Sequence, residues 1–346
     1  MANDMDTFMA TMVAASQPVV IEHAGILARE HYGLEARAER LTGERDENFR
    51  LSGPDGAQYV LKIANAAEDP VVTGLPAAAL RHVERTDAAL PCPRVVPTRT
   101  GSTQVRFRDE AGGERIAYLL TYLRGKLLGA TLRSQRQRTA CGRIAGRLSL
   151  ALRGFAHPAA HRTLIWDVRH AAQIARLLAE IPDFPCRERA DALLARVVPA
   201  LESRLPRLRQ QVVHNDLNPR NILVDPADEA SVTGIIDFGD IAHTALIADV
   251  AVAAADLLPE DCADLPYAAA SIRDIAIAYH ESVPLLEEEF AMLGLLVTAR
   301  LLANLVVPAW HLHRNPGGGH YAALETDFVR ARLGIARRLL HEDFRP

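Results

Sequence analysis

Three side chains with oxygen donors follow one another at fixed spacing in the segment 212–240. Asp216 is followed five positions later by Asn221, and Asp237 lies sixteen positions further on. Carboxylate and amide oxygens are the groups that Mg²⁺ prefers, and proteins usually hold this ion with one or two of them together with substrate phosphates. We therefore expect Asn221 and Asp237 to be metal ligands. Asp216 is placed to accept or orient the proton of a hydroxyl group, so the three residues together predict phosphoryl transfer.

Two short apolar runs must position these side chains. Residues 221–224 and 232–236 are rich in β-branched residues and are bounded by Asp, Pro or Gly. This pattern predicts a hairpin of two buried strands with polar residues at the strand ends. An acidic hairpin without a catalytic role is the alternative. The motif His-x-Asp-x-x-x-x-Asn followed by Asp-Phe-Gly, here from His214 to Gly239, is a protein-kinase-like signature and favours the catalytic interpretation. We interpret His214 as support for the loop rather than as a catalyst.

A second chemical feature is a lysine inside a predicted strand. Arginine is the usual cation of this chain, and Lys62 and Lys126 are its only lysines. Residues 58–63 alternate with the period of a strand, and a charge within such a strand costs desolvation unless an anion meets it. The phosphates of a nucleotide would be that anion. An edge strand that presents Lys62 to water is the alternative.

The surroundings of this lysine complete a nucleotide-binding lobe. The loop 41–49 contains a single glycine, Gly43, and backbone N–H groups of such a turn can bind phosphate oxygens. A helix is expected at 76–83 with Pro76 near its start. This helix carries no acid, so the partner of Lys62 stays open, with Glu68 and Glu84 as candidates.

Other elements extend this outline in chain order. Residues 1–33 read as helical with Gly33 as a stop, and strands are expected at 103–108 and 115–122. Backbone groups of Thr121 and Leu123 would contact a nucleobase at the hinge that follows. The chain is mostly helical from 133 onward, with an apolar helix at 243–258. A buried Asp on that helix, Asp249 or Asp256, is expected to bond the backbone of the catalytic loop.

Composition restricts the setting of the protein. The chain has 346 residues, a net charge of −4 and a pI near 6.4, so no basic surplus indicates a nucleic-acid partner. The four cysteines are scattered without a Cys-x-x-Cys pair, which is typical of a reducing cytoplasm. No basic leader is expected at the N-terminus. The apolar stretch 291–310 contains Arg300, Asn304 and Pro308 and is interpreted as a buried helix rather than a membrane span.

One histidine-rich stretch allows another chemistry. His311, His313 and His320 could bind zinc, but we interpret the stretch as a loop between helices, since such loops commonly collect His, Gly and Pro. Zinc bound there together with the acids would suit a metal-dependent phosphohydrolase, which remains an alternative function.

The motifs and their order resemble the aminoglycoside phosphotransferase-like kinase superfamily over nearly the whole chain. Several stretches are most similar to its hydroxylysine kinase branch, namely 43–49, 59–65, 166–167, 214–218 and 234–240. Asn218 also favours this branch, because antibiotic kinases more often have a His at that position. The resemblance implies an α+β, protein-kinase-like fold. It would comprise an N-terminal helical segment 1–34, a small antiparallel β-rich lobe 35–122 and a mainly helical lobe 123–346 with the catalytic hairpin.

The resemblance also implies roles for single residues. Asp216 would be the base, Asn221 and Asp237 would hold Mg²⁺, and Lys62 would contact the phosphates of ATP or GTP. The acceptor would be a hydroxyl of a small, cationic, amino-alcohol-like metabolite, with hydroxylysine as the leading candidate. Candidate substrate contacts are Asp240, Asn218, Trp166 and Asp167.

Two further functions stay open beside this one: an aminoglycoside kinase that confers resistance, and a nucleotide-binding pseudokinase. We expect a cytoplasmic protein without a membrane or nucleic-acid partner. Its oligomeric state, monomer or homodimer, stays open.

Overall fold

The computed structural model describes residues 18–43, 45–110, 112–131, 133–259, 262–316, 321 and 323–345. The chain divides into two compact units. The first ends at Arg124 and also takes in His157–Ala159, whereas the second comprises Gly125–Ala156 and the chain from Ala160 onward.

The first unit is built on a six-stranded antiparallel sheet with the order β1-β2-β3-β6-β4, in which β5 also pairs with β6. Its strands are β1 (Arg37–Leu41), β2 (Glu47–Ser52), β3 (Gln58–Ile63), β4 (Val95–Val96), β5 (Val105–Arg108) and β6 (Glu114–Thr121). The strands expected from alternation are therefore confirmed, and the turn between β2 and β3 places Gly56 at a φ of 81°, which favours glycine.

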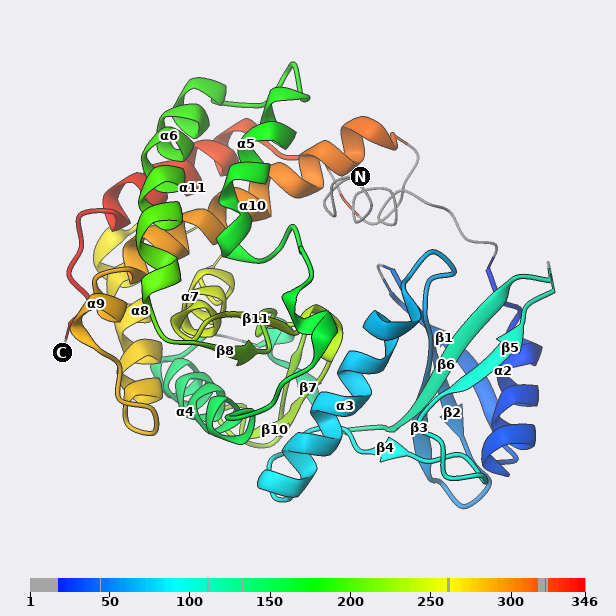
Figure 1. The fold of residues 1–346 in the computed structure, drawn as a ribbon. Helices are drawn as coiled ribbons and strands as arrows, with labels where there is room; N and C mark the ends of the chain where they lie inside the picture. The colour runs from blue at the N-terminus through cyan, green and yellow to red at the C-terminus, as the bar shows by residue number, and fades with distance from the viewer. Residues whose placement is uncertain are drawn as a thin grey trace. The chain divides into compact units, whose positions relative to one another are not determined.

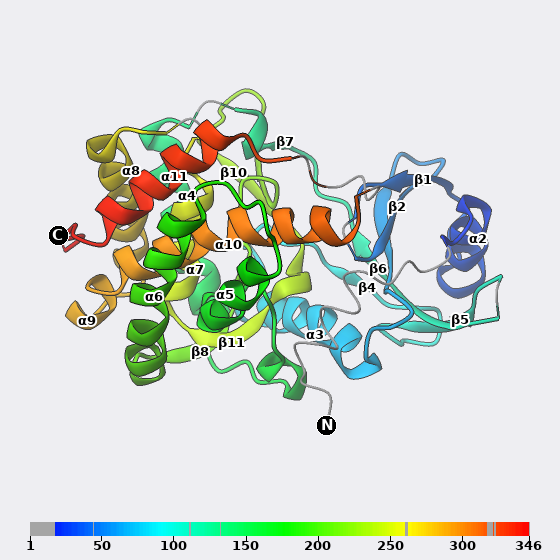
Figure 2. The same cartoon turned by 90° about the horizontal axis from the view of Figure 1, so that it is seen from above.

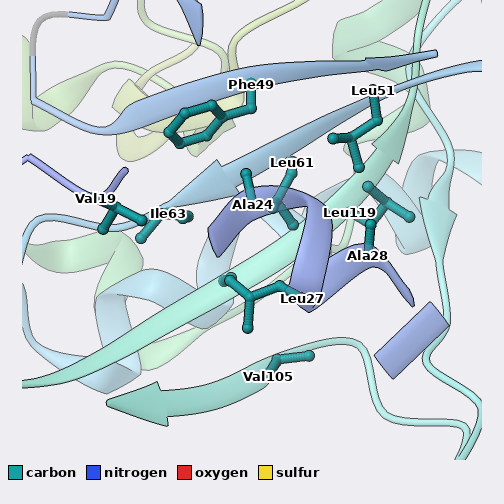
Figure 3. Packing of buried hydrophobic residues seen from close by; sticks show 11 residues of the cluster. Val19, Ala24, Leu27, Ala28, Phe49, Leu51, Leu61, Ile63, Val105 and Leu119 are labelled. Atoms are coloured by element: carbon teal, nitrogen blue, oxygen red, sulfur yellow. The ribbon is translucent and has the colours of Figure 1, made fainter. Parts of the chain in front are cut away.

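The core of this unit lies between the sheet and an N-terminal helix. Helix α2 (Ile21–Leu27) continues into a π-helical turn (Ala28–Tyr32) and stops at Gly33, whose φ is 71°. Its buried residues Ala24 and Leu27 pack against Phe49 and Leu61 of the sheet, as Figure 3 shows. The helical prediction is confirmed for the described part of 1–33, and the rest of that range lies outside the described residues.

The helix expected at 76–83 is longer in the structure, where α3 spans Pro70–Thr86. The helix begins six residues earlier, because Asp69 accepts a hydrogen bond from the N–H of Val71 at 2.7 Å and Pro70 occupies the first turn, where a missing N–H costs nothing. Pro76, predicted to start the helix, is buried inside it. Glu84 is exposed in its last turn.

The second unit is mainly helical. Helix α10 (Leu293–Arg314) packs against α5 (Ala171–Ala179), α6 (Arg187–Arg204), α7 (Ile247–Asp256) and α11 (Thr326–Leu339), as Figures 1 and 2 show. The remaining α-helices are α4 (Gln135–Ala151), α8 (Leu265–His280) and α9 (Glu287–Phe290). Short 3-10 turns are η2 (Leu128–Ala130), η3 (Pro158–His161), η4 (Val168–His170), η5 (Leu205–Arg207) and η6 (Phe238–Asp240).

Helix α10 forms the centre of this helical unit. Among the described residues, the segment Glu287–Arg314 is the one stretch long and apolar enough to cross a membrane by length and composition. Within the fold, 83% of its most apolar window is buried. This burial is that of a core helix, as the polar residues in the sequence predicted.

Two small sheets carry the catalytic segment. One has the order β10-β9-β7, from β10 (Val232–Ile235), β9 (Ile222–Val224) and β7 (Lys126–Leu127), which confirms the predicted hairpin. The other pairs β8 (Gln210–Val213) with β11 (Ala242–Ala245). The helix expected at 243–258 was wrong at its start, because residues 242–245 satisfy their backbone against β8 and the helix begins only at Ile247.

Candidate active site

The catalytic loop between β8 and β9 is anchored by a buried carboxylate. Asp249 of α7 accepts hydrogen bonds from the backbone N–H of His214 at 3.0 Å and of Asn215 at 2.6 Å. Asn215 has a φ of 65°, which turns the chain at this point. Burial raises the pKa of Asp249 to about 6, and the two N–H donors act in the opposite direction. The contact of a buried Asp with the loop backbone is therefore as expected from the sequence.

His214 joins the loop to the end of β10. Its ring is buried, bonds the carbonyl of Ile236 through Nε2 at 3.1 Å, and packs edge-on against Phe238 with the ring centroids 4.8 Å apart. Burial lowers the pKa of His214 to about 4, although the charge of Asp237 opposes the shift. The ring is thus neutral at physiological pH and donates its Nε2 proton to the carbonyl. It supports the loop.

Asp216 is held by donors on both of its carboxylate oxygens. Its Oδ1 accepts from Nη2 of Arg300 at 2.9 Å, and its Oδ2 accepts from Nδ2 of Asn221 at 2.7 Å. The side chain is 19% exposed. Burial raises the pKa of Asp216 to about 7; Arg300 opposes the shift, whereas Asp240 and Asp256 add to it. A carboxylate with such a pKa is suited to take a proton from a hydroxyl group.

Asn221 and Asp237 lie at the adjoining ends of the two hairpin strands, because the N–H of Ile236 donates to the carbonyl of Asn221 at 2.9 Å. The Nδ2 of Asn221 is committed to Asp216, so its Oδ1 is the amide atom that can bind a cation. Asp237 is exposed at a φ of 61° and accepts from the N–H of Gly239 at 3.3 Å. One amide and one carboxylate oxygen are a donor set that fits Mg²⁺.

Three of the four predicted substrate residues, Asp240, Asn218 and Trp166, lie near Asp216 or Arg300. Asp240 is buried beside the loop and acts on the pKa values of both Asp216 and His214, and Asn218 donates a side-chain hydrogen bond to Asp216. Trp166 lies against the Arg300 guanidinium, 5.2 Å from the ring centroid. These three residues therefore lie around the Asp216 carboxylate or the group that holds it.

Asp167 has other partners. Its carboxylate is buried, accepts from the N–H of Arg169 at 2.9 Å and from the hydroxyl of Thr244 at 3.1 Å, and pairs with the Arg169 guanidinium. These contacts cap the η4 turn and attach it to β11. The carboxylate is thus already engaged within the fold.

Two residues of this site, Arg300 and Asn304, were not predicted from the sequence, and Asp256 was expected only as a possible contact of the loop backbone. Arg300 and Asn304 of α10 both bond Asp256, the last residue of α7, and Arg300 also bonds Asp216. A signal was present: two polar residues four positions apart in a long apolar helix share one face. They were considered only as evidence against a membrane span.

In the first unit, Lys62 lies on the interior strand β3, between β2 and β6. The edge-strand alternative is therefore wrong. The lysine side chain is 10% exposed, and its Nζ is 4.0 Å from Oδ2 of Asp46, a distance for an ion pair but too long for a hydrogen bond. Asp46 belongs to the loop between β1 and β2. Asp46 of this loop is thus one acid near Lys62, whereas Glu84 is exposed on α3.

The same loop requires glycine at position 43. A Cβ there would lie 2.1 Å from the carbonyl oxygen of Asp46 and 2.7 Å from the side-chain amide of Asn48, so no larger residue fits this turn. At the other end of the sheet, Thr121 is tied to Arg94 through its hydroxyl at 2.8 Å and its N–H at 2.9 Å. Leu123 lies in the connection that follows β6.

The histidine-rich stretch is placed differently from the expectation. His311 and His313 belong to the last turn of α10 rather than to a loop. His311 is buried against the ring of Tyr321, with centroids 5.2 Å apart, and His313 is exposed. His320 lies outside the described residues. Within the described ranges, no group of three or more His, Cys, Asp and Glu side chains is arranged to hold a metal.

Comparison with known proteins adds independent evidence. The family described as "Phosphotransferase enzyme family" matches residues 37–282. A hydroxylysine kinase of Mus musculus is 26% identical over 332 residues, covering 89% of this chain and 87% of the relative. A homoserine kinase of Methylobacillus flagellatus is 30% identical over 241 residues, covering 68% of each chain.

Solved structures show the fold. A structure of an amicoumacin kinase in complex with AMP-PNP and Ca²⁺ superposes with a TM-score of 0.68 at 14% identity, covering 99% of this chain and 96% of that one. A microcompartment-associated aminopropanol kinase gives a TM-score of 0.66 at 21% identity, covering 93% of this chain and 98% of that one. The predicted protein-kinase-like α+β fold and the resemblance to hydroxylysine kinases are therefore confirmed. The chain belongs to the phosphotransferase enzyme family and is a small-molecule kinase, a phosphotransferase that acts on an alcohol group.

Proposed function

We propose that this enzyme transfers the γ-phosphoryl group of ATP or GTP to a hydroxyl of an amino-alcohol-like metabolite, with hydroxylysine as the leading candidate. The observation that carries the proposal is the Asp216 carboxylate, held between Arg300 and Asn221 with a raised pKa. A carboxylate oriented in this way can accept the proton of an acceptor hydroxyl as phosphoryl transfer proceeds.

The remaining roles follow from donor chemistry. Asn221 and Asp237 would hold Mg²⁺ through one amide and one carboxylate oxygen. Bound there, the ion would neutralise charge on the phosphate oxygens. Lys62 would bind a phosphate, and the N–H groups of the loop at Gly43 would add neutral donors. Backbone groups of Thr121 and Leu123 would contact the nucleobase.

The charges around Asp216 support a cationic acceptor. Asp240 and Asp256 both act on the pKa of Asp216, and Arg300 is the cation that faces this carboxylate and Asp256. Counted together, three carboxylates against one guanidinium leave a negative excess, which suits the ammonium group of an amino alcohol. We propose Asp240 and Asn218 as its nearest contacts, with Trp166 as an apolar wall. Because Asp167 is engaged with Arg169 and Thr244, we assign it an indirect role through the η4 turn beside Trp166.

Curated relatives support the choice of acceptor. Hydroxylysine kinases of three vertebrates match at 24–26% identity over 84–89% of the chain. The homoserine kinase noted above also phosphorylates, by its name, an amino acid with a hydroxyl side chain. Hydroxylysine and homoserine share an ammonium, a carboxylate and an alkyl hydroxyl, and differ in length and in the second amine.

A nucleotide-consumption screen tests the proposal. Purified enzyme with Mg²⁺ and either ATP or GTP is assayed with hydroxylysine, homoserine, aminopropanol, ethanolamine, choline, kanamycin and spectinomycin. We expect turnover with hydroxylysine above the others, and none with the Asp216→Asn variant. Turnover confined to the antibiotics would replace the proposed acceptor by an aminoglycoside. If the wild-type enzyme binds nucleotide, as calorimetry measures, but phosphorylates no acceptor, the pseudokinase alternative gains and the proposal fails.

A further inference from the structure

Arg300 is a buried cation in an otherwise apolar stretch of α10. Its side chain is 4% exposed. The guanidinium directs Nη2 to Asp216 at 2.9 Å and to Asp256 at 2.7 Å, Nε to Asp256 at 3.1 Å, and Nη1 to the carbonyl of Trp166 at 3.3 Å. Each nitrogen thus donates, and the cation is compensated by two carboxylates. A buried charge is tolerable only with such partners.

Asp256 fixes this guanidinium independently of Asp216. Its side chain is 7% exposed and engages both Nε and Nη2 of Arg300, in a fork-like geometry that sets the plane of the group. Asn304, one helical turn beyond Arg300, donates Nδ2 to Oδ1 of Asp256 at 2.6 Å. The indole of Trp166 lies against the same guanidinium at 5.2 Å. The donor that faces Asp216 is therefore oriented by groups that do not touch the catalytic loop.

The oriented guanidinium restricts rotation of the Asp216 carboxylate. Arg300 holds Oδ1 from α10, whereas Asn221 holds Oδ2 from the loop itself. Asn221 is also a proposed Mg²⁺ ligand, so its amide must serve two partners at once. With Arg300 absent, the carboxylate would keep only the donors of its own loop, Asn221 and Asn218, and could turn about the Cβ–Cγ bond. A misplacement of about 1 Å at a reacting group costs about 100-fold in rate.

We infer that Arg300 is a positioning residue for the base Asp216, and that Asp256 and Asn304 hold its guanidinium in place. The inference rests on the proposed role of Asp216 in phosphoryl transfer. A structural ion pair that merely attaches α7 to α10 is the competing explanation. The two explanations differ in what the Asp216 contact contributes, since α7 and α10 are already joined by Arg300, Asp256 and Asn304.

Three variants and a control separate them. Arg300→Met removes the donors but keeps much of the side-chain volume, Arg300→Lys keeps the charge without the fork, and Asn304→Ala loosens Asp256 without removing a charge. Arg138→Met is the control. Arg138 is also buried, at 8% side-chain exposure, and pairs with Asp274 at 2.9 Å, with further bonds to the carbonyl of Arg133 and the hydroxyl of Tyr267.

We expect Arg300→Met to lower kcat about 100-fold while nucleotide affinity stays within about twofold of wild type. Arg300→Lys should recover little, because an ammonium cannot satisfy Asp216, Asp256 and Trp166 together. Asn304→Ala, the mildest change, should fold and lower kcat by a smaller factor. Arg138→Met should lower stability alone. The inference would be overturned if the loss of kcat in Arg300→Met and Asn304→Ala were explained entirely by a lower folded fraction, as is expected for the Arg138→Met control.

A second readout does not depend on turnover. The crystal structure of Arg300→Met, or the carboxyl ¹³C spectrum if only Asn304→Ala folds, reports the orientation of Asp216 directly. We expect the carboxylate to leave its wild-type rotamer or to exchange between two. An unmoved Asp216 refutes the inference whatever the enzyme phosphorylates, whereas wild-type protein that phosphorylates nothing refutes the proposed function instead.

Discussion

Replacing Asp249 by Asn tests how the catalytic loop is held, through the pH dependence of stability. Asp249 is fully buried, and its two carboxylate oxygens accept the N–H groups of His214 and Asn215. The asparagine has nearly the same shape but offers a single acceptor oxygen and cannot ionise. One loop N–H then loses its partner, which costs about 1–3 kcal/mol for a buried donor.

The pKa of Asp249 determines how that difference changes with pH. Burial raises this pKa from the ordinary value of 3.8 to about 6. The folded protein therefore keeps a proton that the unfolded chain releases between about pH 4 and pH 6. This contribution to stability is fully present below about pH 4 and is lost as pH rises through about 6. A shift of about two units corresponds to about 3 kcal/mol over the whole window.

Urea unfolding of both proteins at pH 5.0 and pH 7.5 measures the effect. Between pH 5.0 and pH 7.5, linkage predicts that the wild type loses about 1.4 kcal/mol of this stabilisation, about half of the full change. We expect Asp249→Asn to be less stable than wild type at pH 5.0 and the deficit to shrink by about that amount at pH 7.5. Other titrating groups cancel in the difference, because both proteins contain them.

A matched variant sets the baseline for this comparison. Asp228 is exposed in the turn between β9 and β10, where its carboxylate makes a surface ion pair with Arg136 at 3.5 Å, and such exposed pairs contribute little to stability. The stability difference between Asp228→Asn and wild type should be the same at both pH values. If the stability difference between Asp249→Asn and wild type were also the same at both pH values, burial would not be raising the pKa of Asp249, and our account of the loop anchor would be wrong.

Three further predictions concern the site and its support. Asp216→Asn should lower kcat by several orders of magnitude with nucleotide affinity nearly unchanged, since only the base is removed; turnover near the wild-type level in a rapid-quench assay would disprove the assignment. Asp237→Asn should abolish Mg²⁺-dependent nucleotide binding while Mg²⁺-free binding persists, which calorimetry with and without the ion can distinguish. Gly142→Ala should destabilise the second unit by about 1–3 kcal/mol, because a Cβ would lie 2.3 Å from the carbonyl oxygen of Ile275 on α8. In contrast, Gly334→Ala on α11, with nothing within 4 Å of the new Cβ, should stabilise by about 1 kcal/mol; equal urea midpoints for the two alanine variants would contradict the packing argument.

Much of the fold follows from local patterns. The strands at 58–63 and 115–122 and the stop at Gly33 depend on neighbouring residues alone, and the structure agrees with each. The start expected for α3 missed a local cap, Asp69, whereas the error at 242–245 occurred where a distant partner decides. Residues 242–245 form a strand because β8 supplies hydrogen bonds from a segment about thirty residues earlier, and no local pattern contains that information.

The same distinction holds for the chemistry. The sequence alone predicted the class of reaction, because Asp216, Asn221 and Asp237 follow one another in one short segment, the hairpin of β9 and β10 and the loop just before it. It also placed Lys62 on a strand, since alternation is a local property. Only the tertiary structure showed that Arg300 bonds the Asp216 carboxylate across 84 residues of sequence and that Asp256 and Asn304 hold it there. Packing of α7 against α10 creates this contact, and burial of the group raises the pKa of Asp216. Both effects depend on distances through space, to which the order of residues along the chain gives no direct access.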